Sequence, residues 1–369
     1  MSSGIRQTPL FECHIGRGAK MAPFAGWNMP INYREGILAE HRHTREQASI
    51  FDICHMGEMR VAGKGAAAAL DARLARPVLG QKPGVCRYNF LLNEQGGVID
   101  DLIVYAMAEE DFFIVVNAAN IDADAEALRA AMPEGVTFEN LSDRIAKIDL
   151  QGPKSAQVLA KLGVPTAELP AYYHCKTQRV ADTPCILSRT GYTGELGFEL
   201  YFDADHAADM WQTLLDTDPV LPAGLGARDT LRLEVGYPLY GHELTAATSV
   251  LNAGFGAMLK LAEMPERRFF GREALEAMKP DRKLVGIRLE SRRAGRAGSE
   301  ITAEGRTVGT VSSGAFGPSV GVAVAMAWLD AAFAAPGTPV EIAAGSALLP
   351  GKVCELPFYT EGTARRKLA

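Results

Sequence analysis

Residues 93–105 read NEQGGVIDDLIVY, a turn cluster followed by an apolar run. A second apolar run, Phe90-Leu91-Leu92, precedes the turn, so this stretch is predicted to form a β-hairpin with a five-residue connection. Side chains alternate along a strand, which places Asp100 and Asp101 on opposite faces. One of the two carboxylates must therefore lie among aliphatic side chains, where burial raises its pKa unless a partner pairs with it.

These two carboxylates have two interpretations. A structural interpretation is an aspartate that accepts hydrogen bonds from backbone amides near the turn, and this role suits Asp100 best. A functional interpretation makes Asp101 an acid or base that faces a ligand. The residues of the hairpin alone leave both interpretations open.

Length and composition indicate a soluble globular protein of two or three domains. The chain has 369 residues, of which 47% are hydrophobic and 22% charged. Its net charge of −6 and pI near 5.7 argue against an extended nucleic-acid surface. No apolar run is long enough to span a membrane, and residues 1–6 lack the apolar core of a secretory signal, so neither a membrane nor a nucleic-acid partner is expected.

The six cysteines are scattered and include no Cys-x-x-Cys pair. A disulfide framework is not expected in so long a chain, and no zinc-ligand spacing is present. His41 and His43 are two residues apart on a predicted helix and so do not share a face. We therefore expect reduced, mostly buried thiols, a cytoplasmic protein and no metal site.

Two similar blocks follow a lead-in. Residues 1–50 are expected to form an irregular lead-in with a helix at 35–47, wrapping onto another domain. The first block is predicted to contain a strand at 59–61, a helix at 65–74, the hairpin, a strand at 112–117 and a helix at 121–132 capped by Asn120. The second is predicted to contain a strand at 146–150, a turn at 151–153, a helix at 155–162, strands at 177–180, 185–189 and 197–202, and a helix at 204–215. This repeated order is typical of an α+β fold built from duplicated ferredoxin-like βαββαβ units.

The pattern changes near residue 280. A helix at 227–235 is followed, beyond Met278-Lys279-Pro280, by short strands between glycine turns, the spacing of a small β-barrel. Strands such as 284–289, 307–312, 320–326 and 339–342 are expected. We therefore predict a region 1–280 in two lobes and a C-terminal barrel domain 281–369.

Two further charged residues stand in unusual places. Glu199 puts a carboxylate inside the apolar strand Phe198–Phe202, and its simpler interpretation is an edge-strand side chain that faces water. Arg228 lies in the first turn of a helix, where the dipole disfavours a cation. We expect an anion to hold this arginine, either one of the neighbours Asp229 and Glu234 or a ligand.

Two other motifs are weaker indications of function. Gly224-Leu225-Gly226 precedes a helix but lacks the third glycine of a dinucleotide-binding motif, because Asp229 stands there. The cluster Arg292, Arg293 and Arg296 is of a kind that is usually solvated, although it could dock an acidic partner.

The candidate residues together suit a flat heterocycle with an acidic tail. A carboxylate can accept two parallel hydrogen bonds from an amino-pyrimidine edge, and an arginine can hold a glutamate tail. Aromatic rings can stack on the heterocycle. The aromatic candidates are Tyr88, Phe112, Phe113, Tyr192 and Tyr240.

From Thr8 to about Phe358 the chain resembles the T-protein family of the glycine cleavage system, the tetrahydrofolate-dependent aminomethyltransferases. The motifs that carry the resemblance are Thr8-Pro9-Leu10, Ala19-Lys20-Met21, Phe24-Ala25-Gly26-Trp27, Phe51-Asp52, His55-Met56, Gly96-Gly97-Val98-Ile99-Asp100-Asp101-Leu102, Gln151-Gly152-Pro153, Gly191-Tyr192-Thr193-Gly194-Glu195 and Gly224-Leu225-Gly226-Ala227-Arg228-Asp229-Thr230-Leu231-Arg232-Leu233-Glu234.

The resemblance implies three lobes around a central folate channel, with a C-terminal barrel. It places the catalytic role on Asp101 and the pterin edge on Glu199. The other folate contacts implied by the resemblance are Asn117, Tyr88, Tyr192, Met56, Arg228 and Tyr240. The implied reaction moves an aminomethyl carbon from the lipoyl arm of H-protein to tetrahydrofolate, releases ammonia and needs no metal; the other glycine cleavage components are further implied partners.

The chain departs from the family pattern in two places. Many family members carry an acidic pair, a Thr-Ser/Thr-Pro sequence and a tryptophan in the segment where this chain has residues 243–250, with Ala257 near the position expected for the tryptophan. Earlier in the chain, Ile53-Cys54 stands where the family usually has Val-Ser. A folate-dependent demethylase that acts on another methyl donor is therefore one alternative. A folate-binding iron–sulfur assembly factor is another, although residues 234–243 lack the cysteine of its Lys-Gly-Cys-Tyr-x-Gly-Gln-Glu motif.

Overall fold

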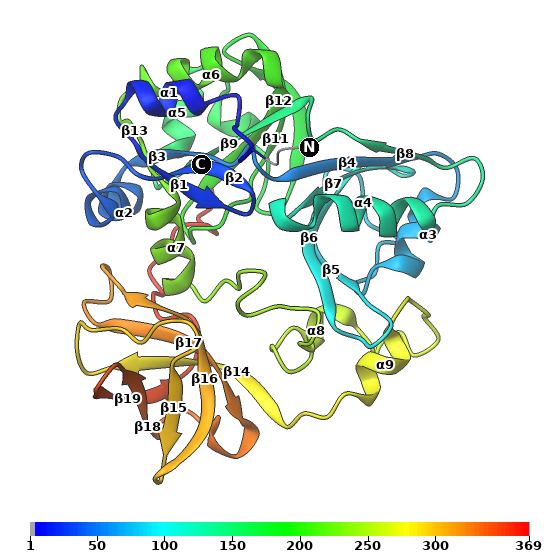
Figure 1. The fold of residues 1–369 in the computed structure, drawn as a ribbon. Coiled ribbons are helices and arrows are strands. Elements are labelled where there is room, and N and C mark those ends of the chain that lie inside the picture. Colours follow the sequence, from blue (N-terminus) through cyan, green and yellow to red (C-terminus); the bar gives the residue numbers. More distant parts are fainter. Residues whose placement is uncertain (1–3, 369) are drawn as a thin grey trace.

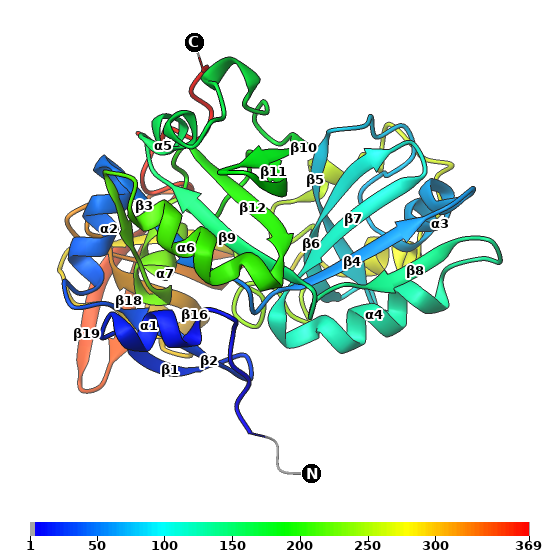
Figure 2. The same cartoon turned by 90° about the horizontal axis from the view of Figure 1, so that it is seen from above.

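The computed structural model describes residues 4–368 of the chain. Two sheet-and-helix units lie side by side, and a barrel lies below one of them (Figure 1). Seen from above, the strands of the two sheets approach one another at β10 and β5 (Figure 2). An isolated bridge between Val85 and His174 joins the units at this edge.

The first unit is built around the hairpin that the sequence predicts. Its elements are β4 (Gly57–Ala62), α3 (Ala66–Arg73), β5 (Cys86–Leu92), β6 (Val98–Ala108), β7 (Asp111–Val116), η1 (Ala118–Asn120), α4 (Ile121–Ala130) and β8 (Thr137–Asn140). The strand order is β5-β6-β7-β4-β8. Leu102, Val104 and Ile114 lie in a core cluster on one face of this sheet. The predicted hairpin is confirmed, with a connection from Asn93 to Gly97.

The second unit repeats this order. Its elements are β9 (Ile145–Gln151), α5 (Ser155–Lys161), η2 (Thr166–Glu168), β10 (Cys175–Val180), β11 (Thr183–Ser188), β12 (Gly197–Asp203), η3 (Ala204–His206), α6 (Ala207–Leu215) and β13 (Val220–Pro222). In both units the opening strand, β4 or β9, lies beside the last strand of the antiparallel run, β7 or β12. The predicted α+β fold with duplicated units is therefore confirmed.

The lead-in is more ordered than the prediction. It contains α1 (Phe11–Gly16), β1 (Lys20–Phe24), β2 (Trp27–Asn32), α2 (Ile37–Glu46) and β3 (Ala48–Asp52). Strand β3 inserts between β9 and β13, so that β13 pairs with it in parallel instead of reaching β9. All five residues of β3 are buried, and His14 binds the Asp52 carboxylate at 2.8 Å, which explains why this segment is ordered. Helix α2 confirms the helix expected at 35–47, whereas the expectation of an irregular lead-in is wrong for α1, β1, β2 and β3.

The C-terminal strands form the predicted barrel, which is closed. It consists of β14 (Arg282–Leu289), β15 (Glu300–Ala303), β16 (Arg306–Phe316), β17 (Ala323–Asp330), β18 (Pro339–Ala344) and β19 (Ala347–Cys354), with η4 (Ala331–Phe333) between β17 and β18. The prediction omits β15 and β19. It also begins β17 three residues early, because Gly321 forms a turn with φ of 81°. The division into a region 1–280 and a domain 281–369 stays a prediction about folding units.

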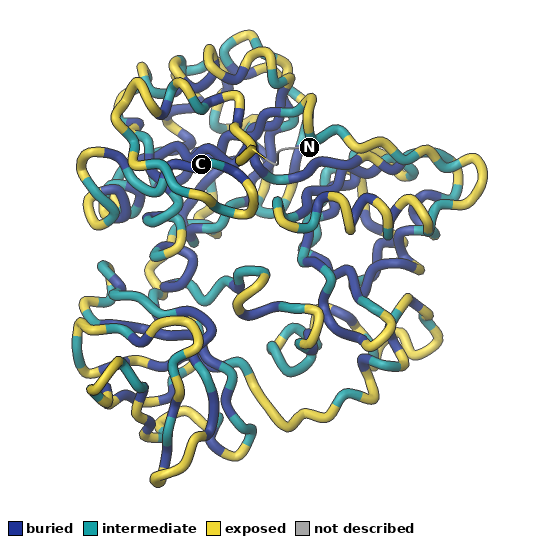
Figure 3. The backbone as a smooth tube through the Cα atoms, viewed as in Figure 1, coloured by how far each residue is buried: buried dark blue, intermediate teal, exposed yellow. Residues whose placement is uncertain are grey.

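Helix α7 and the C-terminal tail connect the barrel to the second unit. Helix α7 (Leu225–Glu234) brings Leu233 against the barrel residues Val324 and Met326. After β19 the tail returns to the second unit, where the Thr363 hydroxyl donates to Glu195 at 2.5 Å. Helices α8 (Gly256–Leu259) and α9 (Arg272–Ala277) lie below the hairpin (Figure 1). Buried segments follow the strands, whereas the outer loops are exposed (Figure 3).

Within residues 4–368, no helix is both long and apolar enough to cross a membrane.

Candidate functional site

The eight candidate site residues come from both units and from the segment around α7. Seven of them are half-buried, and Glu199 alone is buried. The half-buried residues are Met56, Tyr88, Asp101, Asn117, Tyr192, Arg228 and Tyr240. Side chains that are neither in the core nor fully exposed are typical of the lining of a ligand site.

Asp101 is held by two side chains of its own unit. The Tyr88 hydroxyl on β5 donates to Oδ2 at 2.9 Å, and the Asn117 amide donates to Oδ1 at 3.1 Å. Burial and the neighbouring Asp100 raise the pKa of Asp101 to about 7. A carboxyl group with this pKa can both accept and return a proton near neutral pH.

Asp100 has a structural role, as the sequence suggested, although its backbone donor is Asn117 after β7 and not an amide of the hairpin turn. It is buried and accepts hydrogen bonds from the Asn117 backbone amide, the Asn117 side chain and the Asn120 side chain, each at 2.8 Å. Asn120 occupies the predicted N-cap position of α4 but makes no side-chain capping hydrogen bond, because its side chain turns toward Asp100 and the Ile99 carbonyl. Burial and the neighbouring Asp100 raise the pKa of the buried Asp124 to about 10, so the Asp124 carboxyl group is protonated at neutral pH.

Glu199 lies in the middle of a sheet. Strand β12 is flanked by β11 and β9, so the interpretation of Glu199 as an edge-strand residue facing water is wrong. Lys147 contacts Oε1 at 3.0 Å, while the hydroxyls of Tyr105 and Tyr201 donate to Oε2 at 3.2 Å each. Thr190 also donates to Oε2. Burial raises the pKa of Glu199, but Lys147, the Thr190 hydrogen bond and Arg228 outweigh it and hold the pKa below its ordinary value.

Arg228 is held by an anion from a distant strand. Its Nη1 contacts the buried Asp149 carboxylate on β9 at 2.5 Å, and its guanidinium lies 4.9 Å from the centre of the Tyr192 ring. The alternative pairs from sequence are not formed, because Asp229 pairs with Arg232 and Glu234 pairs with Arg45. The structure therefore replaces a local partner with Asp149.

The aromatic candidates separate into two groups. Tyr88 packs against Phe255, with 5.8 Å between the ring centres, and lies in one apolar cluster with Tyr240. The Tyr192 hydroxyl donates to the Pro238 carbonyl. Phe112 and Phe113 are buried instead, Phe112 in the core of the first unit and Phe113 against Tyr201. The three tyrosines therefore stay candidate site residues, whereas both phenylalanines belong to the core.

The sequence interpretation missed Lys147 and Asp149, the charged partners of Glu199 and Arg228. Both lie on β9, whose residues 147, 149 and 151 are polar and alternate with apolar ones. That period of two was a detectable signal, since it places the three side chains on one face of a buried strand. Met56 completes the group, with its sulfur 3.4 Å from the Lys147 ammonium.

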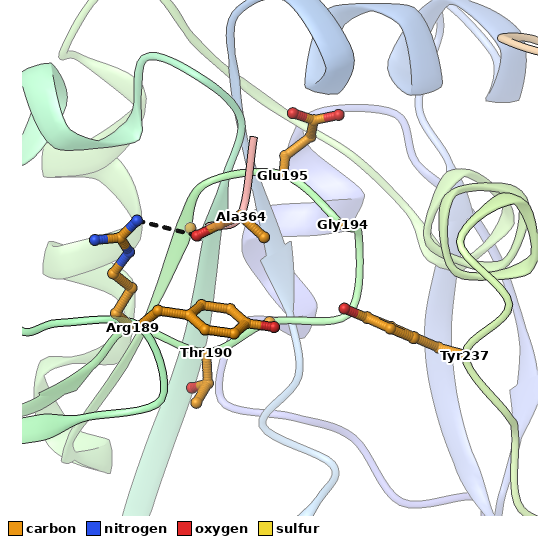
Figure 4. A pocket seen from close by; sticks show the side chains of 9 residues that line it. Arg189, Thr190, Gly194, Glu195, Tyr237 and Ala364 are labelled. Carbon is orange, nitrogen blue, oxygen red and sulfur yellow. Dashed lines mark hydrogen bonds between the residues drawn. The ribbon is translucent and has the colours of Figure 1, made fainter. Parts of the chain in front are cut away.

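A small cavity lies behind the glycine-rich turn 189–197. Its volume is about 10 Å³, room for about one water molecule, and the C-terminal tail closes it through Ala364, whose carbonyl accepts from Arg189 (Figure 4). A larger hollow of about 290 Å³ lies beside the N-terminal segment, where Arg6, Trp27 and Cys54 line it. Among residues 4–368, no group of three or more His, Cys, Asp or Glu side chains is placed to hold a metal ion.

Comparisons with known proteins agree with this architecture. Residues 10–263 match the family model of the GCVT N-terminal domain, and residues 282–360 match that of the glycine cleavage T-protein C-terminal barrel domain. The chain is 42% identical to an aminomethyltransferase of Cutibacterium acnes, over 96% of this chain and 98% of that one. It is also 42% identical to an aminomethyltransferase of Saccharopolyspora erythraea, over 97% and 99% of the two chains.

A solved structure gives the same result. The crystal structure of the glycine cleavage system aminomethyltransferase T from Bartonella henselae matches with a TM-score of 0.92 and 35% identity, over 98% of this chain and 99% of that one. Two duplicated α+β units with a closed C-terminal barrel thus define the class of folate-dependent one-carbon transferases. Within that class, the chain belongs to the glycine cleavage T-protein family, the aminomethyltransferases, and it is an enzyme.

Proposed function

We propose that this enzyme moves the aminomethyl carbon from the lipoyl arm of H-protein to tetrahydrofolate. The products are ammonia, the dihydrolipoyl arm and 5,10-methylenetetrahydrofolate. The observation that carries the proposal is the Asp101 carboxyl group, oriented by Tyr88 and Asn117 and with its pKa raised to about 7. Membership of the T-protein family supports the choice of donor and acceptor.

In this proposal Asp101 is the catalytic residue. Transfer needs an electrophilic, iminium-like carbon and the nucleophilic N5 of the folate, which must lose a proton. The Asp101 carboxylate accepts that proton and stabilises the developing positive charge, which contributes on the order of a hundred-fold or more in rate. The raised pKa suits this role, because the group is available as a base near neutral pH.

The remaining candidates bind the folate. Glu199 accepts hydrogen bonds from the pterin edge, and Arg228 attracts the acidic tail. Met56, Tyr88, Asn117, Tyr192 and Tyr240 surround the ring system, which is supported by their half-buried side chains. Glu199 already accepts from several donors, so the pterin edge would use the lone pair that remains on Oε1 or replace a hydroxyl.

Calorimetry with tetrahydrofolate tests the binding assignment. We expect Glu199→Ala to weaken binding at least ten-fold, because a charged hydrogen-bond acceptor is lost. Glu199→Gln, which keeps the shape of the side chain, should also weaken binding, and Glu341→Ala on an exposed barrel strand is the matched control. Unchanged affinity in folded Glu199 variants would remove Glu199 from the pterin edge.

A second assay tests the donor. Turnover with lipoylated H-protein carrying the aminomethyl group is compared with turnover on simple methyl donors such as methylated amines and sulfonium compounds. Transfer only from H-protein supports the proposal, whereas transfer only from a methyl donor would identify a demethylase. A cytoplasmic location is part of the proposal, supported by six free cysteines, as expected in a reducing compartment.

A further inference from the structure

Lys147 is a buried cation beside Glu199. The residue is 1% exposed, and its ammonium contacts Glu199 Oε1 at 3.0 Å. Its other neighbours are the Met56 sulfur at 3.4 Å and the Tyr201 ring, whose centre is 5.2 Å away. An ammonium has three donors, and a thioether sulfur accepts only weakly. Lys147 therefore has a single strong acceptor and retains donor capacity.

The surroundings of Lys147 contain further unsatisfied polar atoms. Among the described residues, neither carboxyl oxygen of Glu58 nor Nδ1 of His55 has a hydrogen-bond partner, and both residues are buried. Burial raises the pKa of Glu58 well above its ordinary value, which disfavours a second negative charge near Lys147. Buried polar groups are normally paired, and these atoms, whose residues both interact electrostatically with Lys147, have hydrogen-bonding capacity left.

We propose that Lys147 donates a hydrogen bond to the ring carbonyl oxygen at C4 of the reduced pterin, next to the pterin N–H from which Glu199 accepts. This inference rests on the proposed tetrahydrofolate function and adds a specificity-determining residue to it. The reading edge of a pterin carries two donors, the 2-amino group and N3–H, followed by one acceptor, the C4 carbonyl. A carboxylate with an ammonium 3.0 Å away is complementary to that order.

Glu199 retains the hydrogen-bond acceptor capacity that this arrangement requires. The hydroxyl donors lie on Oε2, while Oε1 accepts from Lys147 alone and keeps one lone pair. A pterin N–H can occupy that lone pair while the neighbouring carbonyl accepts from Lys147. A ring with an amino group at C4 would instead place a donor against the ammonium and, because its N3 carries no hydrogen, an acceptor at N3, so the site would reject it.

The competing explanation is that Lys147 only neutralises Glu199. If Lys147 were only a counter-ion, its removal would change the affinity of all ligands of Glu199 alike. If Lys147 donates to the C4 carbonyl, its removal weakens the binding only of ligands that have a carbonyl at C4. The ratio of affinities for two ligands that differ at C4 therefore separates the two explanations.

The experiment measures by calorimetry the affinity of the full-length enzyme for tetrahydrofolate and for its 4-amino-4-deoxy counterpart. We expect the wild type to favour tetrahydrofolate by about a hundred-fold. Lys147→Met should weaken tetrahydrofolate binding about 10- to 100-fold and change binding of the 4-amino compound less than about three-fold. Lys64→Met, at an exposed lysine outside the site, should leave both affinities unchanged.

A second pair of variants protects the test from a folding failure, since Lys147→Met leaves Glu199 buried without its cation. Lys147→Met combined with Glu199→Gln is charge-balanced and is compared with Glu199→Gln alone. The inference is supported if the preference for tetrahydrofolate over the 4-amino compound disappears when Lys147 is removed from the Glu199→Gln variant. It is overturned if removing Lys147 weakens the binding of both ligands equally. If the wild type binds neither ligand, the proposed function itself fails; binding of tetrahydrofolate with a ratio insensitive to Lys147 overturns only this inference.

Discussion

The Tyr88 hydroxyl donates a 2.9 Å hydrogen bond to Asp101 across the hairpin, although the two residues are not register partners. Tyr88 pairs with Ile103 and Asp101 with Phe90, so the tyrosine reaches diagonally along the sheet. The Asn117 amide holds the other carboxyl oxygen at 3.1 Å. Asp101 thus keeps one orientation, which a proton acceptor in a reaction requires.

Asp101→Asn should abolish most of the activity while leaving folate binding in place. The amide has the same shape but cannot accept a proton, so turnover should fall by about two orders of magnitude or more. Steady-state kinetics gives the turnover, and calorimetry with tetrahydrofolate gives the affinity. Near-normal turnover would show that Asp101 is not the base.

Tyr88→Phe should move the pH profile of the reaction. The wild type is expected to lose activity as the pH falls below about 7, the pKa of Asp101, because the base becomes protonated. The Tyr88 hydrogen bond lowers that pKa, so removing it raises the pKa and shifts the limb upward by about one pH unit. The pH dependence of kcat/KM measures this shift. If the loss of activity at acidic pH were unchanged in Tyr88→Phe, a group other than Asp101 would control it.

Asp100→Ala should destabilise the protein, in contrast to Asp101→Asn. It removes the acceptor of the Asn117 backbone amide and one acceptor each of the Asn117 and Asn120 side chains, at a loss of about 2–4 kcal/mol in the free energy of unfolding. Asp101→Asn should change that free energy by less than about 1 kcal/mol. Urea unfolding compares the two variants, and equal effects would contradict the division of roles.

Asp124→Asn should gain stability relative to the wild type as the pH rises. The native pKa of about 10 exceeds the unfolded value of about 4, so between these values the native state binds more protons and wild-type stability falls with increasing pH. The asparagine does not titrate, and the difference in unfolding free energy should grow from about pH 4 upward. Asp122→Asn, at an exposed position of the same helix, should follow the wild type. Parallel curves for Asp124→Asn and wild type would refute a neutral Asp124.

Gly97→Ala should disturb the contact between the hairpin and the segment after Tyr240. A Cβ atom there would lie 1.9 Å from the Ala246 carbonyl oxygen, which is backbone and cannot turn away. We expect a loss of about 2–4 kcal/mol, whereas Gly16→Ala, which meets nothing within 4 Å, should change stability by about 0.5 kcal/mol or less. Thermal unfolding measures both variants, and a harmless Gly97→Ala would show that this segment is free to move.

Local rules predicted the hairpin and the opposite orientation of Asp100 and Asp101, because alternation depends only on the chain itself. They could not decide which carboxylate is occupied by hydrogen-bond donors, because Asn117 and Asn120 reach Asp100 only after β7 has paired with β6. The same limit explains the wrong expectation for Glu199. Whether a strand is central or at an edge is a property of the whole sheet.

The sequence alone determined the repeated order of strands and helices, the barrel and the residues that carry the family resemblance. Only the tertiary structure placed Asp149 opposite Glu199 in the β9–β12 register, inserted β3 between β9 and β13, and gave Arg228 and Glu199 their partners Asp149 and Lys147. Secondary structure follows from periods of two and 3.6 within a short window of sequence. The charged pairs of the site join strands and helices far apart in the chain, so they exist only once the sheet order and register have formed.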